Sequence, residues 1–136
     1  MRLLTGYAVS IGWTIAFLAL AFVARFAFDG LTPFRLRQAS DEKNAAVGHV
    51  LRGLYVALAI ISFAAIQSTQ SLLWALIDAA FGIALLLLFF KIYDWIDPRD
   101  FEQELVAGNT MLGMELEGLF VIFAGVIVGA MNLLGA

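Results

Sequence analysis

Residues 44–56 read NAAVGHVLRGLYV, and residues 109–121 read NTMLGMELEGLFV, so one pattern returns after 65 residues. The shared offset places Gly48 opposite Gly113, and it also pairs Pro33 with Pro98 in the segments that precede each stretch. Asparagine, glycine and proline in one register are hard to obtain from two arbitrary apolar helices. The sequence therefore predicts an internal repeat, with one copy at about residues 3–66 and the other at about 72–134.

The segments around these stretches are long enough and apolar enough to cross a membrane. Hydrophobic residues make up 62% of the 136 residues and charged residues only 14%, with a mean hydropathy of +0.93. A spanning helix needs about 20 predominantly apolar residues, and four segments meet this condition: 3–28, 45–66, 72–93 and 105–134. The prediction is an all-α membrane protein with four transmembrane helices in a single domain, residues 1–136.

Each repeat then forms a helical hairpin: a helix, a charged connection and a second helix. Because each copy contains two spans, both copies enter the membrane in the same direction, and a pseudo-twofold axis along the membrane normal is expected to relate them. The expected product is a four-helix bundle. The fourth segment is longer than the hydrocarbon core requires, so its first turns are expected to tilt or project into water.

Lysine and arginine are unequally shared between the two ends of this bundle. The two long connections carry Arg35, Arg37, Lys43 and Arg99, whereas the other end has Arg2. The positive-inside rule places the connections in the cytoplasm and both termini in the periplasm or outside the cell. The first segment starts like a signal peptide but stays apolar up to residue 28, so we expect it to be retained. Asp29 with Pro33, and Asp94 with Pro98, are interpreted as helix stops.

One face of the second and fourth helices combines small and polar residues. At 100° per residue, five positions of the second helix fall within an arc of about 80°, and their repeat mates occupy the same arc. Small residues let helices approach closely in lipid, so this stripe is predicted to be the packing face. Its members are Asn44, Gly48, Arg52, Tyr55 and Ala59, with Asn109, Gly113, Glu117, Phe120 and Ala124 as mates. Gly125 and Gly129 form a separate GxxxG motif, which would serve the bundle or a second protomer.

Arg25 and Lys91 lie at the margins of their predicted spans. Five further charged or titratable residues lie deeper, where charges are expensive and face a partner or water. Arg52 and Glu117 are repeat mates of opposite sign, and they are interpreted either as an ion pair that fixes helix register or as an ion-coordinating gate. Asp78 is either a hydrogen-bonding packing residue or a proton or cation site. Glu115 is read as an interfacial carboxylate, and His49 as an interfacial residue or a pH sensor.

Several functional classes are excluded by what the chain lacks. With no cysteine and one histidine, it has neither thiolate zinc or iron–sulfur ligands nor a multi-histidine metal site. The net charge of −3 and the pI near 4.9 argue against nucleic acid as a partner. No phosphate-binding glycine loop, nucleophile elbow or zinc-protease motif occurs. We therefore expect a protein without enzymatic activity, metal or cofactor.

The amide-rich helix starts and the proline-bearing connections resemble the YjfL-like family of small four-span bacterial inner-membrane proteins, a domain of unknown function. The matching stretches are residues 41–48 (DEKNAAVG) and 102–113, and the resemblance extends over nearly the whole chain. The family shows a run of asparagines where this chain has Lys43-Asn44, and small residues where it has His49 and Arg52. The resemblance implies the bacterial inner membrane and an internal duplication, and it carries no established activity.

Two functions fit these features. The first is a non-enzymatic membrane subunit that self-associates or acts as the scaffold of an envelope assembly, with lipid and other membrane proteins as partners. The second is an oligomeric channel or transporter for small cations or protons. In that case Asp78, Glu115, Glu117 and Arg52 would form the polar path.

Overall fold

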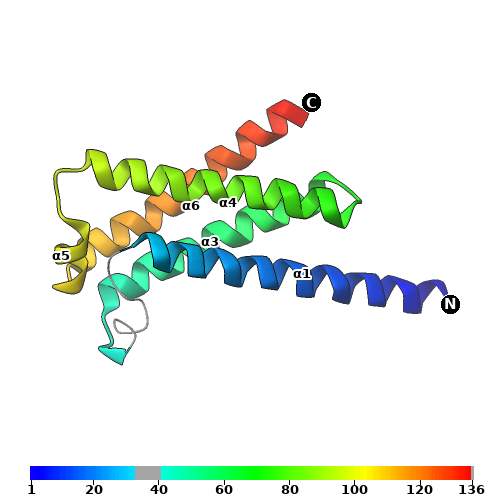
Figure 1. The fold of residues 1–136 in the computed structure, drawn as a ribbon, viewed down its shortest axis with the longest axis horizontal. Coiled ribbons are helices and arrows are strands. Elements are labelled where there is room, and N and C mark those ends of the chain that lie inside the picture. Colours follow the sequence, from blue (N-terminus) through cyan, green and yellow to red (C-terminus); the bar gives the residue numbers. More distant parts are fainter. Residues whose placement is uncertain (33–40, 136) are drawn as a thin grey trace.

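The computed structural model describes residues 1–32 and 41–135, and within these ranges the regular structure is helical. The helices are α1 (Arg2–Leu31), α3 (Ala45–Ser68), α4 (Leu72–Ile96), α5 (Phe101–Val106) and α6 (Thr110–Gly135) (Figure 1). Helices α1, α3 and α4, and residues Thr110–Asn132 of α6, are each long and apolar enough to span a membrane. The chain is a multi-pass membrane protein that contacts the lipid bilayer, and the prediction of four spans is confirmed.

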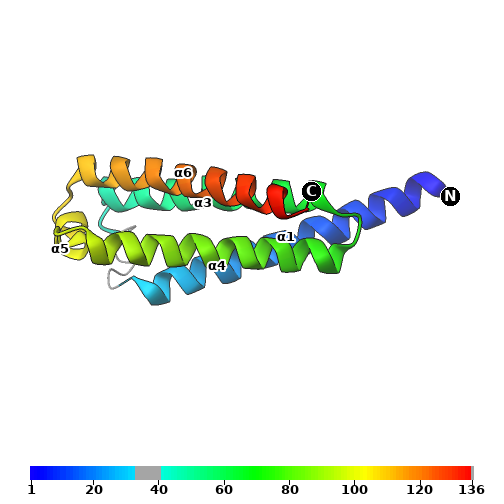
Figure 2. The ribbon, with the colours of Figure 1, turned by 90° about the horizontal axis from the view of Figure 1, so that it is seen from above.

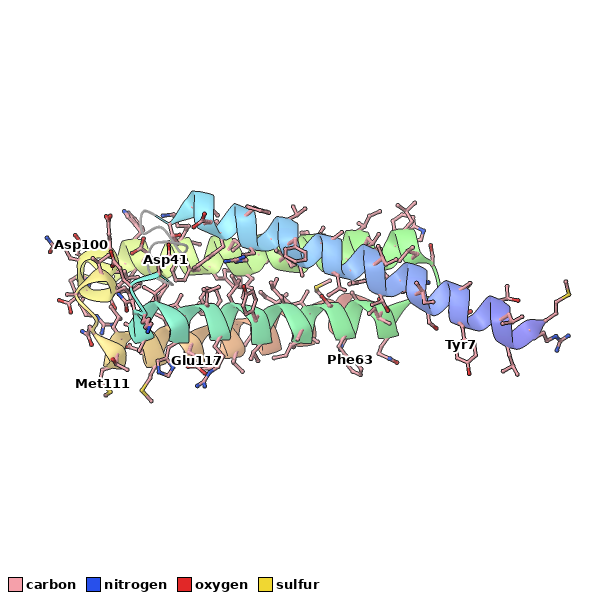
Figure 3. All side chains as sticks on the ribbon, turned by 90° about the horizontal axis from the view of Figure 1, so that it is seen from below. Tyr7, Asp41, Phe63, Asp100, Met111 and Glu117 are labelled. Atoms are coloured by element: carbon pink, nitrogen blue, oxygen red, sulfur yellow. The ribbon has the colours of Figure 1, made fainter. Side chains whose placement is uncertain are left out.

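The packing is less symmetric than the expected four-helix bundle. Helices α3 and α6 run in the same direction and form the most extensive contact, α4 packs against both, and α1 packs mainly along α4. The α3–α6 pair forms one layer, and α4 and much of α1 lie on the same side of it (Figures 2 and 3). Both termini lie at the end of the α3–α4 turn, and α5 lies at the opposite end (Figure 1).

The fourth segment is broken where the sequence suggested one long helix. Leu105 belongs to the short helix α5, and the last spanning helix begins only at Thr110. The break has a local cause. Gly108 adopts a φ of +84°, a left-handed conformation that ends a helix at little cost only for glycine. Asn109 then caps α6, because its Oδ1 accepts a hydrogen bond from Leu112 N at 3.2 Å.

The other boundaries are close to the expected ones. Helix α1 continues to Leu31, and the hydroxyl of Thr32 donates back to the carbonyl of Phe28 at 2.9 Å. Helix α4 ends at Ile96, two residues before Pro98. The helix stop expected at Pro33, and the positive charges expected at Arg35 and Arg37, lie outside the described residues.

Three phenylalanines from three helices form the centre of the core. Phe28 of α1 contacts Phe90 of α4 and Phe120 of α6 edge to face, with ring centroids 5.3 and 5.7 Å apart. Phe90 and Phe120 stack on each other at 5.1 Å. Such aromatic pairs add about 0.5–1.5 kcal/mol beyond the area they bury. They fix the C-terminal end of α1 to the other helices.

The N-terminal part of α1 is not attached in this way. Only 11% of the most apolar part of α1 is buried, and residues 1–12 are exposed along their whole length. This part of the helix projects beyond the other helices (Figures 2 and 3). In a bilayer these apolar side chains contact lipid, which is as apolar as the protein core.

Candidate functional site

The backbones of α3 and α6 approach each other closely at two glycines. A Cβ atom built on Gly53 would lie 2.6 Å from the Cα of Glu117. A Cβ atom on Gly113 would overlap the carbonyl oxygen of Ala46 and lie 2.9 Å from its Cα. The two positions have room for glycine alone, so Gly113 is a helix-packing residue within the chain, as its place in the predicted stripe suggested.

The predicted packing stripe is divided between two environments. On α6 its members face inward, since Gly113, Phe120 and Ala124 are buried. On α3 the corresponding stripe faces outward: Gly48, Arg52, Tyr55 and Ala59 are all exposed. The buried face of α3 lies on the other side of the helix, where larger apolar side chains fill the space between α4 and α6. That face consists of Ala46, Val47, Val50, Gly53, Leu54, Ala57, Leu58, Ile61 and Ala65.

Three ionisable side chains meet where α3 and α6 approach each other. Arg52 Nε donates to Glu117 Oε1 at 2.6 Å, and Nδ1 of His49 lies 2.6 Å from Glu117 Oε2. The structure therefore brings the predicted pair of Arg52 and Glu117 together, and it adds His49. Glu117 is 19% exposed and Arg52 is 65% exposed. Figure 3 shows Glu117 at the outer side of the α3–α6 layer, away from α1.

The depth of this cluster follows from helix geometry. Arg52 and Glu117 each lie seven residues after the first residue of their helix, which corresponds to about 10 Å along the axis. Helix α3 has 24 residues and is about 36 Å long at 1.5 Å per residue, a little more than the hydrocarbon core of about 30 Å. An exposed guanidinium at this depth lies within the outer part of the core, unless another protein surface or water covers it.

Glu115 belongs to a second cluster, near α5. Arg99 Nη1 donates to Glu115 Oε2 at 2.9 Å, and the hydroxyl of Tyr93 donates to Glu115 Oε1 at 3.1 Å. The Arg99 side chain also forms two hydrogen bonds to Asp97, at 2.9 Å from Nε and 2.7 Å from Nη2. These contacts join the end of α4 to the start of α6. Glu115 is thus a paired carboxylate near one end of the helices.

The charge of Asp97 is strongly stabilised by this arrangement. The side chain of Arg99, and then its backbone N–H, donate to the carboxylate, and they lower the pKa of Asp97 from 3.8 to about 2. The same hydrogen bonds raise the pKa of Arg99 above its ordinary value. The pair was not among the predicted site residues, because the sequence pattern pointed to Arg99 only through the charge balance of the two membrane faces.

Asp78 lies at the opposite end, near the short turn between α3 and α4. The hydroxyl of Ser68 donates to Asp78 Oδ2 at 3.2 Å, so Asp78 links the last turn of α3 to α4. The Arg52–Glu117 cluster and the Glu115 cluster lie near the α5 end of the molecule. Asp78 is therefore separated from the other charged candidates along the length of the bundle.

Asn44 and Asn109 perform the same local task at the starts of α3 and α6. Asn44 Oδ1 accepts from Val47 N at 3.3 Å, and Asn109 Oδ1 accepts from Leu112 N at 3.2 Å. The side-chain amide of Asn44 also donates to the carbonyl of Leu105 at 2.8 Å, which holds α5 against the start of α3. The amide of Asn109 donates to Glu104 Oε2 at 2.7 Å. Both asparagines thus organise the α5 end.

Four other glycines of α3 and α6 have open space around them. No neighbouring atom lies within 4 Å of a Cβ built on Gly48, Gly118, Gly125 or Gly129. The three on α6 fall within an arc of about 40° at 100° per residue, on the side opposite its buried face. Gly48, Gly125 and Gly129, which were expected to pack helices, therefore pack nothing within the chain. For Gly125 and Gly129, the alternative contact with a second protomer remains a prediction.

Helices α3 and α6 diverge toward their C-terminal ends (Figure 1). Residues of both helices line a groove there. Its volume is about 560 Å³, and its lining is Ala59, Ile60, Phe63, Ala64, Gln67, Ser68, Val128 and Asn132. The groove is mainly apolar, with its polar groups near the α3–α4 turn. Among residues 1–32 and 41–135, no three histidine or acidic side chains are grouped so that they could hold a metal ion.

Nearly the whole chain matches one protein family. A family described as Domain of Unknown Function (DUF350) matches residues 2–131. No curated protein and no solved structure matches the chain. The match covers α1, α3, α4, residues 110–131 of α6 and both charged clusters. The chain therefore belongs to the family described as Domain of Unknown Function (DUF350).

Proposed function

We propose that this protein is a non-enzymatic subunit of the bacterial inner membrane that self-associates and serves as a scaffold in an envelope assembly. The observation that carries the proposal is the exposed position of Arg52. Its side chain is 65% exposed on the outer side of α3, about 10 Å along the helix. A charged group facing lipid hydrocarbon is unfavourable by at least about 2.5–3.5 kcal/mol at the membrane centre, and by less near the interface.

A protein partner on this face would remove that penalty. The ion pair with Glu117 already shields part of the guanidinium, but most of the side chain stays uncovered. The exposed glycines around it support the same conclusion, because small residues allow close helix contact and are enriched where transmembrane helices associate. A single chain thus carries an interaction surface on its α3–α6 layer that its own helices do not use.

The internal duplication and the orientation form part of this proposal. Equivalent caps at Asn44 and Asn109, 65 residues apart, support a repeat of one hairpin, although the packing around the two copies has diverged. The positive-inside rule favours cytoplasmic connections and periplasmic termini. The family match over nearly the whole chain is compatible with the resemblance to the YjfL-like proteins, which points to the bacterial inner membrane.

Co-purification tests self-association directly. Two copies with different tags are expressed in one bacterial cell, the membranes are solubilised in a mild detergent, and one tag is used for capture. We expect the second copy to be recovered with the first. Mixing separately expressed membranes after solubilisation is the control for association in detergent alone. Recovery of only the captured copy, with both copies present in the membrane, would contradict the proposal.

The alternative function, conduction of ions or protons, receives less support from the fold. The charged candidates at the two ends are separated by an apolar interior that includes Phe28, Phe90 and Phe120, so a polar path would have to form between several chains. Liposomes that contain the purified protein, a pH dye and a potential-sensitive dye test this function. Flux above that of empty liposomes, lost in Asp78→Asn, would favour conduction over the scaffold.

A further inference from the structure

The contact between α3 and α6 joins two different faces of equivalent helices. On α3 the face consists of Ala46, Gly53 and Ala57, all buried, which we call the Ala46 face. On α6 it consists of Gly113, Glu117 and Ala124, which we call the Gly113 face. Gly113 lies on the backbone of Ala46, and Gly53 lies on the backbone of Glu117. A contact of this type is heterologous, because unlike surfaces meet.

Each of these faces has an equivalent that remains free. A shift of 65 residues turns the Gly113 face into Gly48, Arg52 and Ala59 of α3, which we call the Gly48 face. The same shift turns the Ala46 face into Met111, Gly118 and Ile122 of α6, which we call the Met111 face. All six residues are exposed. The two glycines that make the close contacts inside the chain thus have glycine mates in the free faces.

These free glycines have no function within a single chain. A Cβ on Gly48 or Gly118 would meet no neighbouring atom, so alanine would fit at either position. Glycine inside a helix is less favourable than alanine by about 0.5–1 kcal/mol. Glycine at both positions is explained if another helix backbone lies against each of them, as happens at Gly113 and Gly53.

We infer that a second copy of this chain binds here, with the Gly48 face of one copy against the Met111 face of the next. The inference rests on the proposed self-association and specifies its surface. The contact would repeat the α3–α6 packing seen within the chain. Gly48 would lie over the backbone of Met111 in the neighbouring copy, and Gly118 of that copy would lie over the backbone of Arg52.

The charges on the two faces are complementary. Within the chain, Arg52 pairs with Glu117, and these residues are themselves repeat mates. In the contact between copies, α3 of one copy takes the place that α6 has within the chain, and α6 of the neighbouring copy takes the place of α3. Arg52 therefore again lies next to a Glu117, which belongs to the neighbouring copy. With 65% of its side chain exposed, Arg52 retains donors for this second carboxylate. The contact would cover the charge that is left uncovered in one chain.

The geometry also determines the kind of assembly. Each copy carries both free faces, and neither is occupied by α1 or α4, which lie on the other side of the α3–α6 layer (Figure 3). A heterologous contact can therefore be repeated from copy to copy, and it produces a ring if the rotation closes and a row if it does not. Helices α3 and α6 would alternate along it.

Cysteine crosslinking tests the pairing, since the chain has no cysteine of its own. Gly48→Cys and Met111→Cys are placed on separately tagged copies, expressed together and oxidised in native membranes. We expect mixed 48–111 crosslinks to exceed crosslinks between two copies of either variant. A predominance of 48–48 or 111–111 crosslinks would show a symmetric dimer and overturn the inference, while self-association would stand.

Bulky substitutions provide the second measurement. Gly48→Leu and Gly118→Leu fill open space in one chain, so the chain itself should keep its thermal stability. Association in lipid nanodiscs should weaken by about tenfold or more, which corresponds to about 1.4 kcal/mol. The matched control is Gly12→Leu on α1, where the space is also open, and it should associate normally. Unchanged oligomers in both α3 and α6 variants would overturn the inferred surface, and monomers in the unmodified protein would overturn the proposed function as well.

Discussion

Gly53 of α3 lies directly against the backbone of Glu117 on α6, with 2.6 Å between the site of its missing Cβ and the Glu117 Cα. The glycine and the acid are therefore linked: the absence of one side chain allows the other helix to approach, and the approach places the Glu117 carboxylate beside Arg52 and His49. The missing Cβ of Gly53 therefore determines both how closely α3 and α6 pack at this point and where the Glu117 carboxylate lies.

Gly53→Ala should destabilise the chain. The added methyl group must displace backbone atoms of α6, and overpacking of this kind is unfavourable by about 1–3 kcal/mol. The matched control is Gly118→Ala, the repeat mate, which has open space. Thermal unfolding followed by tryptophan fluorescence, at a dilution where the detergent-solubilised protein is monomeric, compares them. Equal unfolding temperatures for the two variants would contradict the close contact.

The interaction of Arg52 with Glu117 should appear as coupling between the two residues. Arg52→Gln and Glu117→Gln each remove the ion pair, so the double variant should unfold at a temperature close to that of the less stable single variant. His49 retains a hydrogen-bonding partner in Arg52→Gln and has a weaker one in Glu117→Gln, so the second change should be the more harmful. Strictly additive effects would show that the two side chains act independently.

The capping asparagines should differ in importance. Asn109→Ala removes the cap of α6 and should destabilise the chain by about 1 kcal/mol. Each change also removes a hydrogen bond of the side-chain amide, to the Leu105 carbonyl for Asn44 and to Glu104 Oε2 for Asn109. The Glu104 side chain can turn to water, whereas the carbonyl belongs to the fully buried Leu105, so the effect of Asn44→Ala should be larger. Asn44→Asp keeps the capping oxygen and loses the donor, and it should fall between the unmodified protein and Asn44→Ala. Chemical or thermal unfolding of the three variants gives the order.

The Asp97–Arg99 pair should contribute a stability that depends on pH at the acid end. The folded-state pKa of Asp97, about 2, lies below the value of 3.8 for a free aspartate side chain. The contribution is therefore complete above about pH 4 and is lost as the pH falls toward 2. The difference in unfolding temperature between the unmodified protein and Asp97→Asn should shrink over this window. A difference that stays constant from pH 5 to pH 2 would contradict the assignment.

The proposed orientation predicts which positions a membrane-impermeant maleimide can reach in intact cells. Gln70→Cys, in the α3–α4 turn, should react from outside once the outer membrane is permeable. Glu102→Cys, in α5, should react only after the inner membrane is opened. The reverse pattern would place the termini in the cytoplasm.

The four spans were predictable because segments this long and this apolar are stable as helices in lipid and unfavourable when exposed to water. The pairing of Arg52 with Glu117 was also predictable, since their shared register places them at one height on parallel helices. The orientation of α3 was not, because its stripe of small residues and its larger apolar face are both suited to helix packing in lipid. The sequence alone does not say which of these two surfaces of α3 contacts α6 of the same chain and which is exposed.

Local features explain the other points at which the structure departs from the prediction. The end of α5 depends on the left-handed conformation of Gly108, and the apolar run that continues beyond it concealed the break. The contacts of Arg99 with Asp97 and Glu115 join residues from a loop and two helix ends, and spacing along one helix does not reveal such a set. His49 reaches Glu117 because α6 lies so close, and that distance became visible only with the fold.

The free N-terminal part of α1 has a consequence for how the sequence can change. Between Arg2 and Gly12 the helix is held by its solubility in lipid rather than by the shape of neighbouring side chains. Its residues can therefore be exchanged for other apolar residues with little effect, whereas Phe28 is confined by two other rings. Helix α1 thus contains an N-terminal part that tolerates apolar substitutions and a C-terminal part that does not. The boundary between them lies where α4 begins to cover α1.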